Sequence, residues 1–417
     1  MKQYQEYKDS GIPWIGKVPA SWDISALRHS VECIDGKRIP VETTQRAEMQ
    51  GDIPYWGAGN IVDYVDRALF DEELILLGED GAPFFDYTRP VAFHITEPIW
   101  ANNHIHVLRA KPNADAEYIV HALNAVDYKE YINGAILNKL TQSAMNRIKI
   151  PLPALETQKR ISAYLNKRIT SINKVIDQKN ELIDLLQEKR TSTISTAVTK
   201  GIDFTVEMCN SGIDWLGEVP VHWQILTNHQ LFAERNIKCS EPDAVLLSVT
   251  KHLGVILQSQ AEEMNLATVA PAETTEGYKV VRKGDLVMNI MRAKDGSYGI
   301  SDYDGVISPA YCIYYTRQEA NPQYLYYLFK TPMYMEIFKN YSTGIAEHRM
   351  RLYPVNFFKI PAVVPPLDEQ NEIVAYLDRR VKDIDELITL TQQQIEKLKE
   401  YRQSIISEVV TGKVAVE

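Results

Sequence analysis

Cysteine is scarce in this sequence, and long apolar runs are absent from it. The chain has 417 residues and four cysteines, which are scattered and show no CxxC spacing. That pattern argues against a zinc site and a disulfide framework, and it predicts small buried thiols in a reducing compartment. No apolar stretch approaches the roughly 18 residues of a membrane span, and the N-terminal segment is polar. We therefore expect a soluble, cytoplasmic protein.

The sequence also lacks the motifs of a methyltransferase. No glycine-rich segment follows an apolar run in the way that an S-adenosylmethionine site requires. The stretch Asn321-Pro322-Gln323-Tyr324 differs by one residue from the NPPY type of motif of amino-methyltransferases, because Gln323 replaces the second proline. Asn followed by Pro before an apolar helical pattern is typical of a helix N-cap, and we interpret Asn321 in that way.

Candidate residues for a nuclease or a metal site are equally isolated. Glu79 and Asp80 are adjacent in LLGEDGA, but no PD…(D/E)xK arrangement accompanies them, so we favour a charged turn. His104 and His106 alternate along an expected strand and would share one face. Without a third ligand we interpret them as surface histidines. We therefore expect no catalytic residue and no metal on this chain.

The balance of charge is acidic. The formal net charge of −10 argues against a simple nucleic-acid-binding protein. The excess is uneven, because segment 154–201 carries 9 basic and 5 acidic residues, whereas segment 361–417 carries 7 basic and 11 acidic residues. Opposite net charges on two similar segments favour their packing against each other.

What the sequence has instead is a continuous stretch, 155–200, without glycine or proline. Its apolar residues recur at steps of three and four, which predicts one helix of roughly 45 residues and about 65 Å. A helix of that length cannot bury its apolar stripe within one small domain, and residues 367–411 supply a partner with the same pattern. The residues expected to pair the helices are Ile161, Leu165, Ile172, Ile176, Ile183 and Leu186 in the first and Ile373, Leu377, Ile384, Ile388, Ile395 and Leu398 in the second.

The two helices belong to an internal repeat. Gln158 corresponds to Gln370 at an offset of 212 residues (370 − 158). A related segment precedes each repeated domain, SGIPWIGKVPASW over 10–22 and SGIDWLGEVPVHW over 211–223. Proline and glycine fix a bend, and the tryptophans offer large apolar anchors. We therefore expect each segment, named here the first and the second tie, to fasten a domain edge to a helix end.

The repeat sets the expected domain boundaries. Between ties and helices, short apolar runs bounded by Gly and Asp predict strands, and Asn113, Asp115 and Asn321 are expected helix N-caps. The expected order is an N-terminal tie over 1–22, a mixed domain over 23–150, a long helix over 151–201, a second tie over 202–223, a mixed domain over 224–366 and a C-terminal long helix over 367–417.

This order of elements resembles the specificity (S) subunit of type I restriction–modification systems. The resemblance rests on the repeated tie, (S)G-I-x-W-[IL]-G-x-[IV]-P-x-x-W, and on a Lys-Ile-Pro element leading into each long helix, and it covers essentially the whole chain. It implies an α+β protein with an internal two-fold repeat, in which two mixed α/β target-recognition domains are separated by two long antiparallel helices that form a coiled coil. Each domain of that family recognises one half of a split DNA site, so the resemblance implies a non-catalytic DNA sequence-recognition subunit.

Direct readout of DNA needs bidentate donors and acceptors on loops that reach the major groove. We therefore select polar residues in expected turns of the two mixed domains. For Asn102 and Asn103 a tight strand-to-strand turn is the alternative, because Asn favours turns. The candidate DNA contacts are Asn60, Arg89, Asn102, Asn103, His104 and Lys139 in the first domain and Lys251, Asn289, Arg292, Lys294, Arg349 and Arg351 in the second.

The resemblance also implies partners. Two methyltransferase (M) subunits would dock along the helices, and restriction (R) translocase and nuclease subunits would join them on double-stranded DNA. S-adenosylmethionine, ATP and Mg²⁺ would be bound by these partners, and this chain would bind no cofactor. Two other functions stay open on the residues alone. A protein-only coiled-coil adaptor is permitted by the net charge of −10, and a stand-alone DNA methyltransferase or nuclease is disfavoured by the missing motifs.

Overall fold

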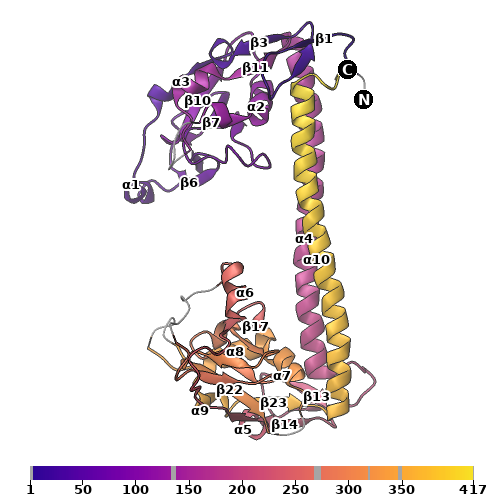
Figure 1. The fold of residues 1–417 in the computed structure, drawn as a ribbon. Helices are drawn as coiled ribbons and strands as arrows, with labels where there is room; N and C mark the ends of the chain where they lie inside the picture. The colour runs from indigo at the N-terminus through magenta and orange to yellow at the C-terminus, as the bar shows by residue number, and fades with distance from the viewer. Residues whose placement is uncertain (1–2, 133–137, 267–273, 318–319, 346–349, 417) are drawn as a thin grey trace. The chain divides into compact units, whose positions relative to one another are not determined.

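The chain forms two compact units, Met1–Glu181 with Thr391–Glu417 and Leu182–Leu390. The computed structural model describes residues 3–132, 138–266, 274–317, 320–345 and 350–416. Each unit contains one mixed domain, one tie and one end of each of the long helices α4 (Leu155–Lys200) and α10 (Leu367–Val410) (Figure 1). Both predicted helices are present, and their bounds agree with the apolar patterns over 155–200 and 367–411 to within one residue. The wider expected segments, 151–201 and 367–417, were too long, because Lys149–Leu152 form a strand and α10 ends at Val410.

The first unit is built on an antiparallel sheet of four strands in the order β4-β10-β7-β8, which α2 covers. The central strand β7, LILLG, is buried at every position. A strand that is covered on both faces needs apolar residues at successive positions, which explains this composition. The other elements complete a three-stranded sheet, β6-β5-β9, and the pair β11-β3. The bounds are β1 (Tyr7–Asp9), β2 (Lys17–Pro19), β3 (Asp23–Ala26), η1 (Leu27–His29), β4 (Val31–Cys33), η2 (Asp35–Lys37), α1 (Thr43–Ala47), β5 (Ile53–Trp56), β6 (Ile61–Val65), β7 (Leu74–Gly78), β8 (Ala92–Ile95), β9 (Trp100–Ala101), β10 (Ile105–Ala110), α2 (Ala116–Ala125), η3 (Tyr128–Glu130), α3 (Gln142–Arg147) and β11 (Lys149–Leu152).

The second unit repeats this plan with the sheet β15-β22-β19-β20. Its core is aromatic, and the rings of Tyr314 and Phe357 stack with centroids 4.5 Å apart. Large rings bury much apolar surface with few rotatable bonds, which suits a domain whose strands are short. The bounds are β12 (Met208–Asn210), β13 (Glu218–Pro220), β14 (Gln224–Thr227), α5 (Asn228–Leu231), β15 (Phe232–Glu234), β16 (Leu247–Thr250), β17 (Gly254–Leu257), α6 (Gln258–Glu263), β18 (Lys279–Val281), β19 (Leu286–Asn289), η4 (Ala293–Asp295), β20 (Tyr298–Ile300), β21 (Gly305–Ile307), β22 (Tyr311–Thr316), α7 (Pro322–Phe329), α8 (Pro332–Tyr341), α9 (Pro354–Phe357) and β23 (Pro361–Val364).

The start of each long helix is bound to a short helix of its own domain through one buried glutamine. Gln158 accepts a hydrogen bond from Asp115 N at 2.9 Å, and Gln370 accepts one from Asn321 N at 2.9 Å. Asp115 and Asn321 cap α2 and α7 with their side chains, as predicted. Asn113 does not cap α2; its side chain donates to a backbone carbonyl instead.

The C-terminal end of each long helix contacts the mixed domain that does not precede it in the sequence. The end of α10 contacts the first domain, and the end of α4 contacts the second. The hydroxyl of Tyr118 lies 3.4 Å from the carbonyl of Val410 in α10, and the hydroxyl of Tyr324 lies 3.0 Å from the carbonyl of Val198 in α4. The ties reach the same places, as expected. Tyr7 beside the first tie donates to the carbonyl that follows α10, and Trp223 of the second tie packs against the glycine that follows α4.

Contacts between the long helices run antiparallel within each unit. In the first unit Asn173 of α4 accepts from Arg402 of α10 at 2.6 Å. In the second, Arg190 of α4 pairs with Asp385 of α10 at 2.8 Å. Seven of the predicted pairing residues are buried, namely Ile161, Leu165, Ile172, Ile176, Ile373, Leu377 and Ile395, whereas Ile183, Leu186, Ile384, Ile388 and Leu398 are partly exposed.

The structure bears on two expectations from composition, one about membrane-spanning helices and one about the burial of the cysteines. Within the described residues, no helix combines the length and apolar character needed to cross a membrane. The expectation that all cysteines are buried was wrong. Only Cys312 is buried, whereas Cys33, Cys209 and Cys239 are partly exposed, because each lies at the edge of its sheet or in a turn.

Candidate nucleic-acid interface

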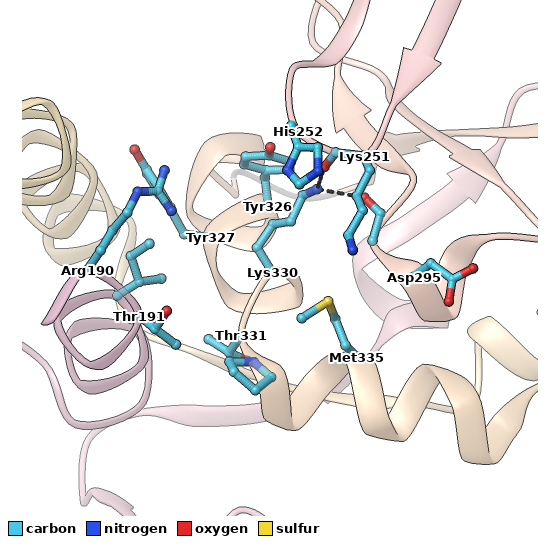
Figure 2. Close-up of a pocket in the computed structure, with 13 residues that line it drawn as sticks. Arg190, Thr191, Lys251, His252, Asp295, Tyr326, Tyr327, Lys330, Thr331 and Met335 are labelled. Atoms are coloured by element: carbon cyan, nitrogen blue, oxygen red, sulfur yellow. Dashed lines mark hydrogen bonds between the residues drawn. The ribbon is translucent and has the colours of Figure 1, made fainter. Parts of the chain in front are cut away.

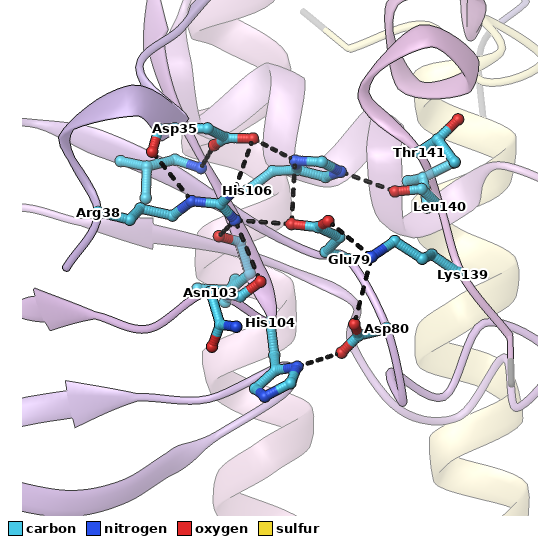
Figure 3. Close-up of polar contacts among 12 residues, drawn as sticks. Asp35, Arg38, Glu79, Asp80, Asn103, His104, His106, Lys139, Leu140 and Thr141 are labelled. Carbon is cyan, nitrogen blue, oxygen red and sulfur yellow. Dashed lines mark hydrogen bonds and ion pairs between the residues drawn. The ribbon is translucent and has the colours of Figure 1, made fainter. Parts of the chain in front are cut away.

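Polar side chains gather in the first unit at the edge where β7 ends opposite the start of β10. The turn after β7 carries Glu79 and Asp80, and Glu79 N donates to the carbonyl of His104 in the neighbouring turn at 2.9 Å. Figure 3 shows these two turns together with Arg38 and Lys139. The candidate contacts His104 and Lys139 therefore lie side by side, although they are 35 residues apart in sequence (139 − 104).

Two carboxylates hold the basic side chains of this cluster. Arg38 Nη1 donates to Glu79 Oε2 at 2.7 Å and to a β10 carbonyl at 2.7 Å. Lys139 Nζ lies 3.2 Å from Glu79 and 3.6 Å from Asp80. Hydrogen bonds between charged groups are the stronger ones, so the two carboxylates fix where these cations are presented. Glu79 and Asp80, which we interpreted as a charged turn, lie in the connection that follows β7, where Asp80 forms an isolated β-bridge with Lys139.

The His104 ring is oriented by Asp80. Its Nδ1 lies 2.5 Å from Asp80 Oδ1, while the side chain is 51% exposed. An ionised carboxylate only accepts, so Nδ1 carries the hydrogen of this contact. Asn102, by contrast, is buried, and its Oδ1 accepts from His104 N at 2.8 Å. That oxygen serves the turn, while the neighbouring Asn103 is exposed.

His106 is not a surface residue, and our interpretation of it was wrong. Its side chain is 1% exposed because β10 is a central strand of the sheet. Nδ1 lies 2.6 Å from Asp35 Oδ2, and Nε2 lies 2.8 Å from the carbonyl of Leu140. Asp35 also accepts from Val107 N at 2.8 Å. His106 therefore anchors η2 and the segment before α3 to the sheet.

Cys33, Asp35 and His106 bring possible ligand atoms within 4.8 Å of one another. Burial raises the pKa of the Cys33 thiol to about 11, which makes the thiolate that a metal ion needs more costly to form. Burial alone would raise the pKa of Asp35, but hydrogen bonds from His106 and Val107 and the charge of Arg38 lower it overall. Both nitrogens of His106 are already engaged. These features describe a hydrogen-bond network rather than a metal centre.

The remaining candidates of the first domain lie in other turns. Asn60 is exposed between β5 and β6, where its carbonyl accepts from Gly57 N at 2.8 Å. Arg89 is exposed between β7 and β8. Neither shares a hydrogen bond with the His104 cluster among the described residues.

In the second unit, three candidates share the turn between β19 and β20. Asn289 Oδ1 accepts from Met291 N at 3.1 Å, which closes the turn. Arg292 is exposed, while Lys294 is largely buried and donates to Asp295 at 3.1 Å. The structure therefore leaves Arg292 as the side chain of this turn that is free to reach a ligand, among the residues described.

Lys251 lies in the turn between β16 and β17, and a lysine connects the two turns. The ammonium of Lys330 donates to the carbonyl of Lys251 at 2.8 Å and to that of Gly296 at 2.6 Å. Gly296 closes the turn that carries Arg292, with φ +85°. Lys251 and Arg292 are thus presented by two turns that one partly buried lysine holds together.

Arg351 approaches the same turn through the backbone. It is exposed, and the next residue, Leu352, donates its N–H to Ile290 O at 2.9 Å. The candidate Arg349 lies outside the described residues.

Two basic residues that organise these sites were missed from the sequence. Arg38 follows Asp35-Gly36-Lys37, and basic residues beside Gly are the pattern by which Arg292 was selected, so a signal existed. Lys330 ends an apolar helical pattern and gave no signal, since its partners are two backbone carbonyls.

Comparison with known proteins gives concordant results. The sequence matches the family described as "Type I restriction modification DNA specificity domain" over residues 19–184 and 260–400. It is 22% identical over 431 residues to the type I restriction enzyme MjaVIII specificity subunit of Methanocaldococcus jannaschii, covering 96% of this chain and 95% of that one. A chain from a solved structure of a type I R-M system has a TM-score of 0.66 at 16% identity, covering 95% and 99%. The HsdS subunit from Thermoanaerobacter tengcongensis has a TM-score of 0.50 at 16% identity, covering 95% and 98%.

Proposed function

The chain belongs to the family of type I restriction–modification DNA specificity subunits, and on that premise we propose that each of its two mixed domains recognises one half of a bipartite DNA site. The observation that carries the proposal is the repeated presentation of polar side chains. Each unit has its own four-stranded sheet with the same plan, and exposes such residues beside the strand ends of that sheet. These residues are His104 and Lys139 in the first unit and Arg292 in the second. The framework repeats and the exposed residues differ, as two different half-sites require.

The proposal extends to protein partners. In the second unit, Leu182, Leu185, Leu387 and Leu390 of the paired helices are between 44% and 56% exposed. Exposed leucines on a helix pair support the docking of further helices. We assign that role to methyltransferase subunits, which would bring in restriction subunits, and we assign S-adenosylmethionine, ATP and Mg²⁺ to those partners. The chain itself would select the sequence on which a multisubunit adenine methyltransferase and endonuclease acts.

The test is to co-express the chain with its methyltransferase partner and to map adenine methylation on a random-sequence duplex library. We expect one bipartite motif, with methylation lost when this chain is omitted. Methylation that lacks sequence preference would contradict the proposal. Assembly with a partner but no DNA binding would instead favour a protein-only adaptor, and methylation by this chain alone would favour an enzyme.

Arg292 provides the sharper test of base recognition. Replacing Arg292 by Ala should weaken specific binding by about 1–3 kcal/mol and relax one base position, because one bidentate contact is lost. Arg282→Ala is the matched control, since Arg282 is also exposed in the second unit but lies in a different turn. Specific binding and base preference should be read from the methylation of the native site and its single-base variants. If Arg292→Ala and Arg282→Ala give the same methylation of the native site and of its single-base variants, Arg292 does not contact a base.

A further inference from the structure

A cavity of about 350 Å³ in the second unit is lined by two lysines, an arginine and a histidine from separate elements. Arg190 comes from α4, Lys251 and His252 from the turn between β16 and β17, and Lys330 from the residue that follows α7. Figure 2 shows these side chains around one space, with Asp295 at its margin. Like charges are not brought together without cost, so a cavity that gathers them is suited to an anion.

Lys330 is built into the wall of this cavity. Its ammonium donates to two backbone carbonyls and lies 4.9 Å from the ring centroid of Tyr298 and 5.4 Å from that of Tyr326. An ammonium has three N–H groups, so one remains for a ligand. Burial, and then the charges of Lys251 and Arg190, lower the pKa of Lys330 to about 8. A bound anion would offset the repulsion that this shift reports.

The carboxylates near the cavity are already paired. Asp295 accepts from Lys294 at 3.1 Å, and Arg190 is paired with Asp385 at 2.8 Å on one side. Among the described residues, no carboxylate forms an ion pair with Lys251 or Lys330. The cavity therefore keeps a positive charge that this unit does not neutralise.

We propose that this cavity binds one phosphate of the DNA backbone through Lys330, Lys251 and Arg190. The proposal rests on the proposed function and adds a sequence-independent contact to it. The cavity adjoins the turn that carries the proposed base contact Arg292, which favours a DNA phosphate over a carboxylate of a protein partner as the bound anion. Gly296, which lines the cavity, closes the same turn that exposes Arg292. We therefore expect a duplex whose base edge meets Arg292 to bring a neighbouring phosphate to the cavity, where lysine acts as a point-charge partner.

The test uses the full chain in complex with its methyltransferase partner and a duplex that contains its methylated motif. Lys251→Gln and Lys330→Met are compared with Lys283→Gln, an exposed lysine of the second unit outside the cavity. Each cavity variant should bind cognate and scrambled duplexes about tenfold more weakly, as one charge-assisted contact requires. Lys251→Gln, which leaves the hydrogen bonds of Lys330 to both turns in place, should also keep the base preference. The slope of log affinity against log salt should fall by about 1 in magnitude. Lys283→Gln should match the wild type.

A scan with methylphosphonate linkages, which remove one phosphate charge at a time, locates the contact. The wild type should lose affinity at one linkage that the Lys251→Gln variant tolerates without further loss. Wild-type affinity and salt slope in both cavity variants would overturn the phosphate site while leaving sequence recognition intact. Unchanged DNA affinity with weaker assembly would assign the cavity to a carboxylate of the partner and would also overturn it. Absence of specific binding by the wild type would instead contradict the proposed function itself.

Discussion

Two glycines stand where the ties meet the ends of the long helices. Gly412 has φ +71°, and a Cβ built there would lie 2.3 Å from Pro19 and 3.1 Å from Trp22. Gly201 has φ +81°, and its Cβ would lie 3.4 Å from Trp223. Both positions require the left-handed conformation, but only the first also lacks room for a methyl group.

Replacing Gly412 by Ala should therefore cost about 2–4 kcal/mol of stability, because the backbone strain adds to an overlap with the first tie. Gly201→Ala should cost about 1–2 kcal/mol, since it adds the backbone strain alone. Denaturant unfolding of the two variants, followed by tryptophan fluorescence, checks the order. A Gly201 variant that is as unstable as the Gly412 variant would show that the close packing at Pro19 is not the cause.

Lys330 predicts a dependence of stability on pH. Its pKa is lowered to about 8 by burial and by Lys251 and Arg190, whereas an unfolded lysine titrates near 10.4. The penalty for folding with a charged Lys330 is fully present below pH 8 and is relieved as pH rises through that value. The free energy of unfolding should thus gain about 1–2 kcal/mol between pH 7.5 and 9.5 from this residue.

The measurement is the difference between the wild type and Lys330→Met at the two pH values. The other groups that face Lys330 are His252, Asp295, Tyr298 and Tyr326, and they are retained in both proteins. Their ionisation therefore cancels to a first approximation. A difference that does not change with pH would show that Lys330 is not destabilised by its site.

Single residues were predicted well where their local sequence decides their role. Asp115 and Asn321 cap helices because an N-cap depends on the next three residues alone. His106 was misplaced because its burial depends on β4 and β7, which lie on either side of β10 and are distant in sequence. Asn102 illustrates the intermediate case, in which the turn was foreseen as an alternative to a DNA contact and the burial of the side chain was not.

At the scale of elements, one buried glutamine near the start of each long helix joins that helix to a short helix of the domain that precedes it. Gln370 is 1% exposed; it accepts from Asn321 N and donates to Pro365 O at 2.8 Å. Gln158 makes the corresponding bonds in the first unit. An amide can do both because it carries a donor and an acceptor, which a carboxylate does not.

Gln370→Glu should therefore destabilise the second unit by about 2–4 kcal/mol at neutral pH, because it buries a charge and leaves the Pro365 carbonyl unpaired. The loss should shrink in acid, where the carboxyl is protonated and can donate again. Gln393→Glu on the exposed side of α10 is the matched control. Urea unfolding at pH 5 and 7.5 measures both variants, and equal stability of the two would contradict the role of Gln370.

The long helices were predictable almost to the residue, whereas the sheets were not. A period of three and four residues sustained over 155–200 leaves few alternatives to a helix. The strands are short, and their partners are fixed by packing across the domain, as with β4 beside β10. Sequence therefore indicated that strands were present without indicating the strand order that brings His104 to Lys139.

For the whole molecule, the repeat means that neither half of the sequence completes a unit alone. The first unit needs the end of α10, and the second needs the end of α4. The resemblance implied paired helices. It did not imply that the end of α10 packs in the unit of the first domain, which follows from contacts such as that of Tyr118 with Val410. Two domains carried by a shared helix pair should act on one DNA at a spacing that depends on helix length.

That dependence leads to a prediction for the DNA site. A helix gains about 1.5 Å and about 100° per residue, so four added residues extend it by about 6 Å and nearly restore its facing. Arg190 lies opposite Asp385, so Gln187 and Leu387 lie at about the same level, and both helices should be extended there to keep their contacts matched. Because B-DNA advances about 3.4 Å per base pair, we expect unchanged half-sites separated by one or two additional base pairs.

Two residues inserted at the same points provide the control, since they rotate each apolar stripe by about 200° and should destabilise the helix pair. Methylation mapping on a library with random spacers gives both results in one experiment. The four-residue variant should retain both half-site sequences, because its domains and the residues that they expose are untouched. An unchanged spacer in that variant would show that the length of α4 and α10 does not set the distance between the half-sites, whereas altered half-sites would show that the domains do not recognise DNA independently of the helices.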